Sequence, residues 1–223
     1  MSKIFRNYFK YPIYLIVLIG LNISFAGSYD DFFRAIRMDD AAEVQQLLAR
    51  GFDPNTLDPQ GQHGLLIAIK EPSPKVAKAL VDAPKINLNI LNRQGESPLM
   101  LAALKGQLDL ASQMVEKGAD VNKTGWTPLH YAASNSNLPL IKLLLENSAY
   151  IDAESPNGTT PLMMASMYGS AEAVKLLLEE GADPQLKNQQ GMTAIQFAQR
   201  ANRKDVAELI AKSIRSQRPP GQW

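Results

Sequence analysis

The sequence contains no cysteine, and among its 223 residues there are only two histidines and two tryptophans. Without cysteine, disulfides, thiolate metal ligands and cysteine nucleophiles are all excluded. The two histidines, His63 and His130, lie far apart in the sequence, and no HExxH motif, phosphate-binding loop or nucleophile elbow is present. We therefore expect no catalytic site, no metal site and no cofactor.

The sequence also lacks an excess of charge of either sign. It has 23 Lys and Arg against 22 Asp and Glu, a formal net charge of +1. Nucleic-acid-binding domains carry their basic residues clustered on one face, and no such cluster stands out here. We therefore expect no nucleic-acid partner.

Residues 1–26 have the pattern of a secretory signal peptide. Three basic residues precede an apolar run over residues 11–23, and Ser24-Phe25-Ala26 places small residues at its first and third positions. The apolar run is shorter than the ~20 residues that a membrane-spanning helix requires. We predict export with cleavage after Ala26. An uncleaved membrane anchor is the alternative.

The rest of the sequence is a repeat. The glycines that open its units, at positions 61, 95, 125, 158 and 191, are 34, 30, 33 and 33 residues apart. The units opened by the second, third and fourth of these glycines begin GESPLMLAA, GWTPLHYAA and GTTPLMMAS. Repeated units of this length are typical of solenoids, in which each unit buries its apolar face against its neighbours.

Each unit predicts two short helices. The first begins at a residue of N-cap type followed by a proline at the first helical position, as in Thr127-Pro128 and Thr160-Pro161. The second has apolar residues at helical spacing, among them Leu144, which we expect to be interior. It ends at a glycine such as Gly118 or Gly181, where a left-handed conformation is expected.

These motifs, together with the helix ends EKGADVN and EEGADPQ, resemble the ankyrin repeat over about residues 28–215. The resemblance implies an all-α fold, a solenoid of about six helix–turn–helix units with β-hairpin-like loop tips. We predict an ankyrin-repeat domain over residues 27–215 and a flexible tail over residues 216–223. The expected units lie near residues 28–60, 61–94, 95–124, 125–157, 158–190 and 191–215.

His130, beside Thr127 and Tyr131, is the most conspicuous candidate for a catalytic base. However, it occupies a slot three residues after the N-cap that other units fill with Met100, Met163 and Gln196. Catalysis does not account for a slot filled by methionine. In the ankyrin family, by resemblance, this histidine is structural. We interpret His130 as part of the helix start.

The resemblance also implies that the protein binds another protein through its concave face, where the positions that vary between units lie, Leu104 and Ser134 among them. Trp126 either contacts a partner or packs on its neighbouring loop, where it would fill the space left by the shortened Asn122–Gly125 connection. The candidate partner-binding residues are Arg93, Glu96, Lys105, Lys123, Trp126, Asn135, Thr159, Tyr168 and Met192.

We expect a monomeric scaffold or accessory factor that acts on another exported protein, in the periplasm of a bacterium or secreted from it. The alternative is a membrane-tethered ankyrin scaffold, with membrane contact only if residues 1–26 are retained. An enzyme or small-molecule-binding protein is a third possibility, which the missing motifs disfavour.

Overall fold

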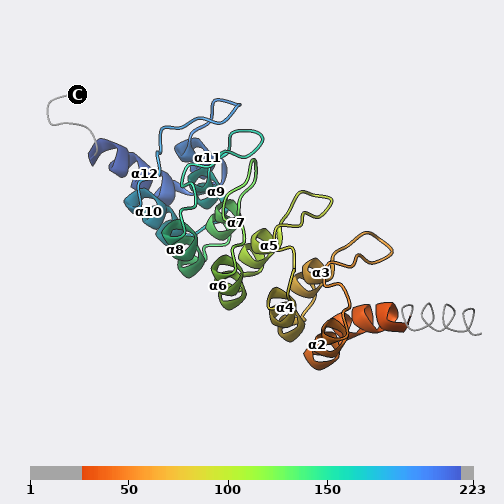
Figure 1. Ribbon diagram of the computed structural model, residues 1–223. Coiled ribbons are helices and arrows are strands. Elements are labelled where there is room, and N and C mark those ends of the chain that lie inside the picture. Colours follow the sequence, from red (N-terminus) through yellow and green to blue (C-terminus); the bar gives the residue numbers. More distant parts are fainter. Residues whose placement is uncertain (1–26, 217–223) are drawn as a thin grey trace, which may run out of the picture. The chain divides into compact units, whose positions relative to one another are not determined.

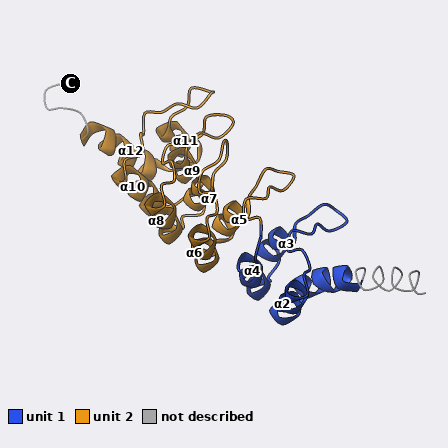
Figure 2. Ribbon diagram, viewed as in Figure 1, with its two compact units in different colours: residues 1–86 blue, residues 87–223 orange. Residues whose placement is uncertain are grey.

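A computed structural model of the chain describes residues 27–216. The predicted signal peptide, residues 1–26, and residues 217–223 of the predicted tail lie outside the described residues. The chain divides into two compact units, residues 1–86 and residues 87–223 (Figure 2). Ser216, the first residue of the predicted tail, is the last residue of a helix.

In the first compact unit, all regular secondary structure among the described residues is helical. Its described helices span residues 27–37, α2 (Ala41–Ala49), α3 (Gly64–Lys70) and α4 (Pro74–Val81). The rings of Phe32 and Phe52 lie 4.6 Å apart, and Phe32 and Ile36 are fully buried. A Cβ on Gly64 would lie 2.9 Å from Cδ1 of Ile36, which explains a glycine at the start of α3, where the next three repeats have proline.

The second unit contains two rows of helices. They are α5 (Pro98–Lys105), α6 (Leu108–Glu116), α7 (Pro128–Ser134), α8 (Leu138–Glu146), α9 (Pro161–Tyr168), α10 (Ala171–Glu179), α11 (Ala194–Arg200) and α12 (Lys204–Ser216). The first helices of successive repeats, α5, α7, α9 and α11, pack one after another and form the first-helix row. The second helices, α6, α8, α10 and α12, form the other row. Figure 1 shows that the loops before the helices of the first-helix row all project to the same side of that row.

The expected all-α solenoid is confirmed by this arrangement. The only strand-like pairing among residues 27–216 is an isolated bridge between Leu57 and His63. The loop tips are closed by backbone hydrogen bonds of hairpin type, such as the one from the Asn92 N–H to the Glu96 carbonyl at 3.0 Å.

The helix boundaries follow from local chemistry. Thr127 and Thr160 are N-cap residues, and Pro128 and Pro161 come directly after them. At the ends of the second helices, Gly118 and Gly181 have φ values of +85° and +99°. Ser148 takes the same place after α8 with φ +64°, in a region that residues with a Cβ seldom adopt.

Small residues let the helices approach closely at the core of the second unit. Ala132 and Ala133 of α7 are completely buried, as are Leu140, Ile141 and Leu144 of α8. One helix pair has no means of burying such an apolar stripe by itself, so the stacking of successive pairs stabilises the unit.

A ladder of polar side chains joins successive turns after the second helices. Oδ1 of Asn122 accepts from the Tyr150 N–H, and its Nδ2 donates to the Ser148 carbonyl, both at 2.8 Å. Asn89 accepts from the Asp120 N–H at 2.9 Å. These bonds satisfy backbone groups that neither helices nor strands pair.

Candidate functional site

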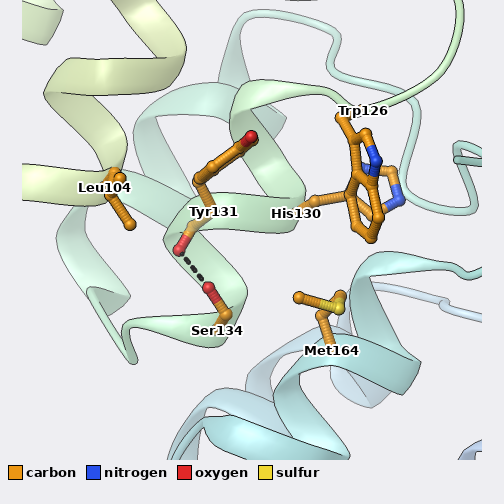
Figure 3. A pocket seen from close by; sticks show the side chains of 6 residues that line it. All are labelled: Leu104, Trp126, His130, Tyr131, Ser134 and Met164. Atoms are coloured by element: carbon orange, nitrogen blue, oxygen red, sulfur yellow. Dashed lines mark hydrogen bonds between the residues drawn. The ribbon is translucent and has the colours of Figure 1, made fainter. Parts of the chain in front are cut away.

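A pocket of about 310 Å³ opens on the row of first helices in the second unit. Its lining residues come from α5, α7 and α9 and from the loop before α7 (Figure 3). They are Leu104, Trp126, His130, Tyr131, Ser134 and Met164. All six belong to one compact unit.

The pocket forms at a repeat position where α7 has a small side chain and the neighbouring helices α5 and α9 have larger ones. Leu104, Ser134 and Met167 occupy the same position in α5, α7 and α9. The side chain of Ser134 is shorter than its two counterparts, and Ser134 lines the pocket. Its hydroxyl donates to the carbonyl oxygen of Tyr131 at 2.9 Å, the dashed line in Figure 3.

His130 is completely buried, and both of its ring nitrogens have partners. Nε2 lies 2.8 Å from the Thr159 carbonyl oxygen, to which it donates. Nδ1 accepts from the Thr127 N–H at 3.2 Å and lies 2.9 Å from the Thr127 hydroxyl. Burial lowers the pKa of His130 to about 4, although the bond to Thr159 opposes the shift. The imidazole is therefore neutral and engaged, and it is poorly suited to act as a base.

In other repeats, the side chain at the position equivalent to His130 accepts the same hydrogen bond from the N–H of the N-cap residue. The Thr160 N–H donates to Sδ of Met163 at 3.5 Å, and the Thr193 N–H donates to Oε1 of Gln196 at 2.7 Å. Three different side chain types thus satisfy the same backbone donor. The local role of the slot is to fasten the start of the first helix.

The pocket wall at Tyr131 is held by Glu96. The Tyr131 hydroxyl donates to Oε1 of Glu96 at 3.1 Å, and Nδ2 of Asn92 donates to Oε2 at 2.7 Å. Burial, and then the Glu96 carboxylate, raise the pKa of Tyr131 to about 12. The phenol therefore stays protonated near neutral pH and serves as a fixed surface.

Trp126 is half-buried and packs on His130. The two ring centroids lie 5.1 Å apart with an interplanar angle of 74°, an edge-to-face arrangement. Nζ of Lys123 donates to the carbonyl oxygens of Thr124 at 3.0 Å and of Trp126 at 3.5 Å. Trp126 thus packs on His130 of its own repeat and also lines the pocket. Its contact with a partner stays a prediction.

The predicted partner-binding residues differ in accessibility. Arg93, Lys105, Asn135 and Tyr168 are exposed, whereas Glu96, Lys123, Trp126 and Met192 are half-buried. Thr159 is only 2% exposed, and its N–H donates to the Ser155 hydroxyl. Because a partner would not reach its side chain, the assignment of Thr159 to the binding surface is corrected.

Tyr131 and Met164 line the pocket but are not among the binding residues that the sequence predicts. They occupy equivalent positions in α7 and α9, where α5 has Leu101 and α11 has Phe197. Variation among Tyr, Met, Leu and Phe at one repeat position was the available signal. This variation does not by itself indicate a binding surface, because each of these residue types is also common in a buried core.

The second histidine also has a local structural role. His63 is the N-cap of α3, and its Nδ1 accepts from the Leu65 N–H at 3.1 Å. Burial lowers the pKa of His63 to about 4, partly opposed by Asp53. Within residues 27–216 no three His, Asp or Glu side chains gather as metal ligands, and no helix combines the length and apolar character needed to cross a membrane.

Helix pairs that repeat along the chain and stack through small alanines are typical of a helical repeat protein. The family profile described as "Ankyrin repeats (3 copies)" matches residues 32–124, 65–155, 121–188 and 151–218. The chain belongs to the ankyrin-repeat family. Proteins of this family are generally interaction modules rather than enzymes.

Known proteins match the chain to different extents. Ankyrin repeat and SAM domain-containing protein 6 of Rattus norvegicus is 35% identical over 109 residues, which are 47% of this chain but only 12% of that protein. The ankyrin repeat protein EF0377 superposes with a TM-score of 0.73 at 27% identity, over 82% of this chain and 96% of its own.

A second solved structure includes a partner. One chain from the complex of the predatory endopeptidase Bd0816 of Bdellovibrio bacteriovorus with the immunity protein Bd3460 superposes with a TM-score of 0.70. The identity is 29%, and the alignment covers 82% of this chain and 97% of the other.

Proposed function

We propose that this protein is a non-enzymatic binding module that acts on another exported protein through the first-helix row of its second unit. The binding surface comprises α5, α7 and α9 and the loops before them. The observation that carries the proposal is the pocket between these helices, with the exposed ring of Tyr168 on α9. Aromatic side chains and well-packed pockets are where interfaces concentrate their binding energy.

The structural likeness to a chain of the Bd0816–Bd3460 complex supports a protein partner. In that complex an immunity protein is bound to an endopeptidase. We therefore propose that the partner of this chain is a defined exported protein, and that an exported hydrolase is the first class to test.

Export of the protein is part of the same proposal. It is supported by the basic, apolar and small-residue pattern of residues 1–26. N-terminal sequencing of the protein purified from its native cells tests it. A chain that begins at Gly27 and is recovered outside the cytoplasm is expected. A chain that begins at residue 1 and sediments with membranes would instead support the tethered form.

The binding proposal is tested by affinity capture from an extract of exported proteins, with the bound proteins identified by mass spectrometry. Tyr168→Ala is compared with Tyr150→Ala, because these two tyrosines are 63% and 69% exposed and only Tyr168 lies on a first helix. We expect one protein whose recovery falls with Tyr168→Ala and is unchanged with Tyr150→Ala. Equal recovery with both variants would overturn the assigned surface.

A further inference from the structure

We propose that the pocket between α5, α7 and α9 receives one large apolar side chain of the partner, presented by a segment with carboxylates beside that side chain. This inference rests on the proposed function and specifies the chemistry of its partner. The occupant is a protein segment and not a cofactor, and the pocket serves as its anchor point.

Three of the polar side chains that line the pocket, those of His130, Tyr131 and Ser134, already have hydrogen-bond partners inside the protein. His130 uses Nε2 on the Thr159 carbonyl and Nδ1 on Thr127. The hydroxyls of Tyr131 and Ser134 donate to Glu96 and to the Tyr131 carbonyl. An occupant therefore meets no unpaired donor of these three side chains, and an apolar group enters without depriving any of them of its hydrogen-bond partner.

The remaining walls favour a large apolar group. Leu104, Trp126 and Met164 supply hydrocarbon, indole and thioether surface, and Figure 3 shows Met164 below the rings of Trp126 and His130. Methionine adapts its shape to an inserted group. A volume of about 310 Å³ lies at the lower end of the ~300–1,000 Å³ range of ligand pockets, so it suits one side chain better than a nucleotide-sized cofactor.

The charges beside the pocket favour an acidic segment. Lys105 directly follows the lining residue Leu104 and is exposed, and the Lys123 ammonium is held beside the Trp126 carbonyl. Neither lysine takes part in an ion pair within the described part of the chain. The carboxylate that holds the pocket wall at Tyr131, Glu96, already accepts hydrogen bonds from Tyr131 and Asn92. Two cations are therefore left to meet carboxylates of the partner.

Short blocked peptides test this chemistry directly. In a Trp223→Phe variant of the full chain, Trp126 is the only tryptophan, so its emission reports on the pocket. The probe is N-acetyl-Glu-Phe-Glu-amide, with Glu-Ala-Glu and Lys-Phe-Lys as matched controls. We expect a saturable emission change with a Kd in the millimolar range for the probe, and at least about tenfold weaker binding of the alanine peptide.

Two sets of variants locate the effect. Ser134→Met places in α7 the residue that α9 has at this position, and it should abolish the emission change by filling the pocket. Ser134→Leu is the second choice if the first does not fold. Lys105→Glu with Lys123→Glu should weaken the acidic probe at least about threefold and reverse its advantage over Lys-Phe-Lys.

No saturable change with the probe up to about 10 mM, or an equal response to Glu-Ala-Glu, would overturn the proposal. An unchanged response in a folded Ser134→Met variant would do so as well.

Failure of the proposed function can be distinguished from failure of this inference. If Ser134→Met retains the captured partner while peptide binding is lost, the anchor is refuted as the partner's site and the binding function stands. If the peptides bind and no exported partner is captured, the binding function is refuted.

Discussion

Nε2 of His130 lies 2.8 Å from the carbonyl oxygen of Thr159, so α7 is hydrogen-bonded to the residue preceding the N-cap of the next first helix. The same ring supports Trp126 from behind. One buried side chain therefore starts its own helix, ties two successive repeats together and forms the back of the pocket. Its environment explains why a neutral histidine resides there without any chemistry to perform.

Replacement of His130 by methionine, the residue at this slot in two neighbouring units, should yield a folded protein. The variant loses the bond to Thr159 and leaves that buried carbonyl unpaired, so we expect the free energy of unfolding to fall by about 1–3 kcal/mol. Urea unfolding followed by circular dichroism measures the change. An unchanged free energy would contradict the role of His130 in joining the two repeats.

The stability of the protein should depend on pH through its two buried histidines. Because burial lowers the pKa of His63 and of His130 from 6.5 to about 4, the unfolded chain binds more protons than the folded one between these values. The contribution of each neutral, buried histidine to the free energy of unfolding is fully present above pH 6.5. As the pH falls to 4, the free energy of unfolding decreases by up to about 3 kcal/mol for each histidine.

Unfolding free energies measured at pH 7 and at pH 4.5 test this dependence. His130→Met should show a clearly smaller difference between the two pH values than the parent, because only His63 then contributes. An identical difference in parent and variant would show that His130 is not buried in its neutral form.

The core of the second unit should be sensitive at Leu144. Its side chain is fully buried in α8, so Leu144→Ala removes apolar contacts and leaves a cavity. We expect a loss of about 2–5 kcal/mol in the free energy of unfolding. Lys142→Ala, at an exposed position of the same helix, is the control and should change stability by no more than about 0.5 kcal/mol. Similar losses in both variants would refute the assigned face of α8.

The polar ladder between repeats makes a graded prediction. Asn122 makes two hydrogen bonds to the next turn, whereas the equivalent Asn89 makes one, to the Asp120 N–H. Asn122→Ala should therefore cost about 1–3 kcal/mol and Asn89→Ala about half as much. Thermal unfolding of the two variants ranks them, and a larger loss for Asn89→Ala would be inconsistent with the ladder.

Much of the fold could be predicted from the sequence because its signals are local. The pair Thr127-Pro128 marks a helix start through capping and the fixed φ of proline, and Gly118 marks a helix end through its left-handed conformation. Repetition of these signals at a constant spacing then fixes how the helix pairs stack.

The pocket was less predictable because it depends on three helices at once. The sequence shows that the position of Ser134 varies between repeats, but the pocket at this position depends on Leu104 and Met164 lining the same space from neighbouring repeats. The burial of Thr159 likewise depends on how the loop tip folds back, with Ser155 accepting its N–H. Side-chain direction and loop closure are tertiary properties that periodicity does not encode.

The central claim is that a partner binds the first-helix row of the second unit. Isothermal titration calorimetry of the captured partner against the parent, Tyr168→Ala and Tyr150→Ala tests it most directly. We predict that Tyr168→Ala raises the Kd at least about tenfold, as truncation of an interface aromatic commonly does, and that Tyr150→Ala leaves it within about twofold of the parent. A Kd that rises with Tyr150→Ala and not with Tyr168→Ala would contradict the claim.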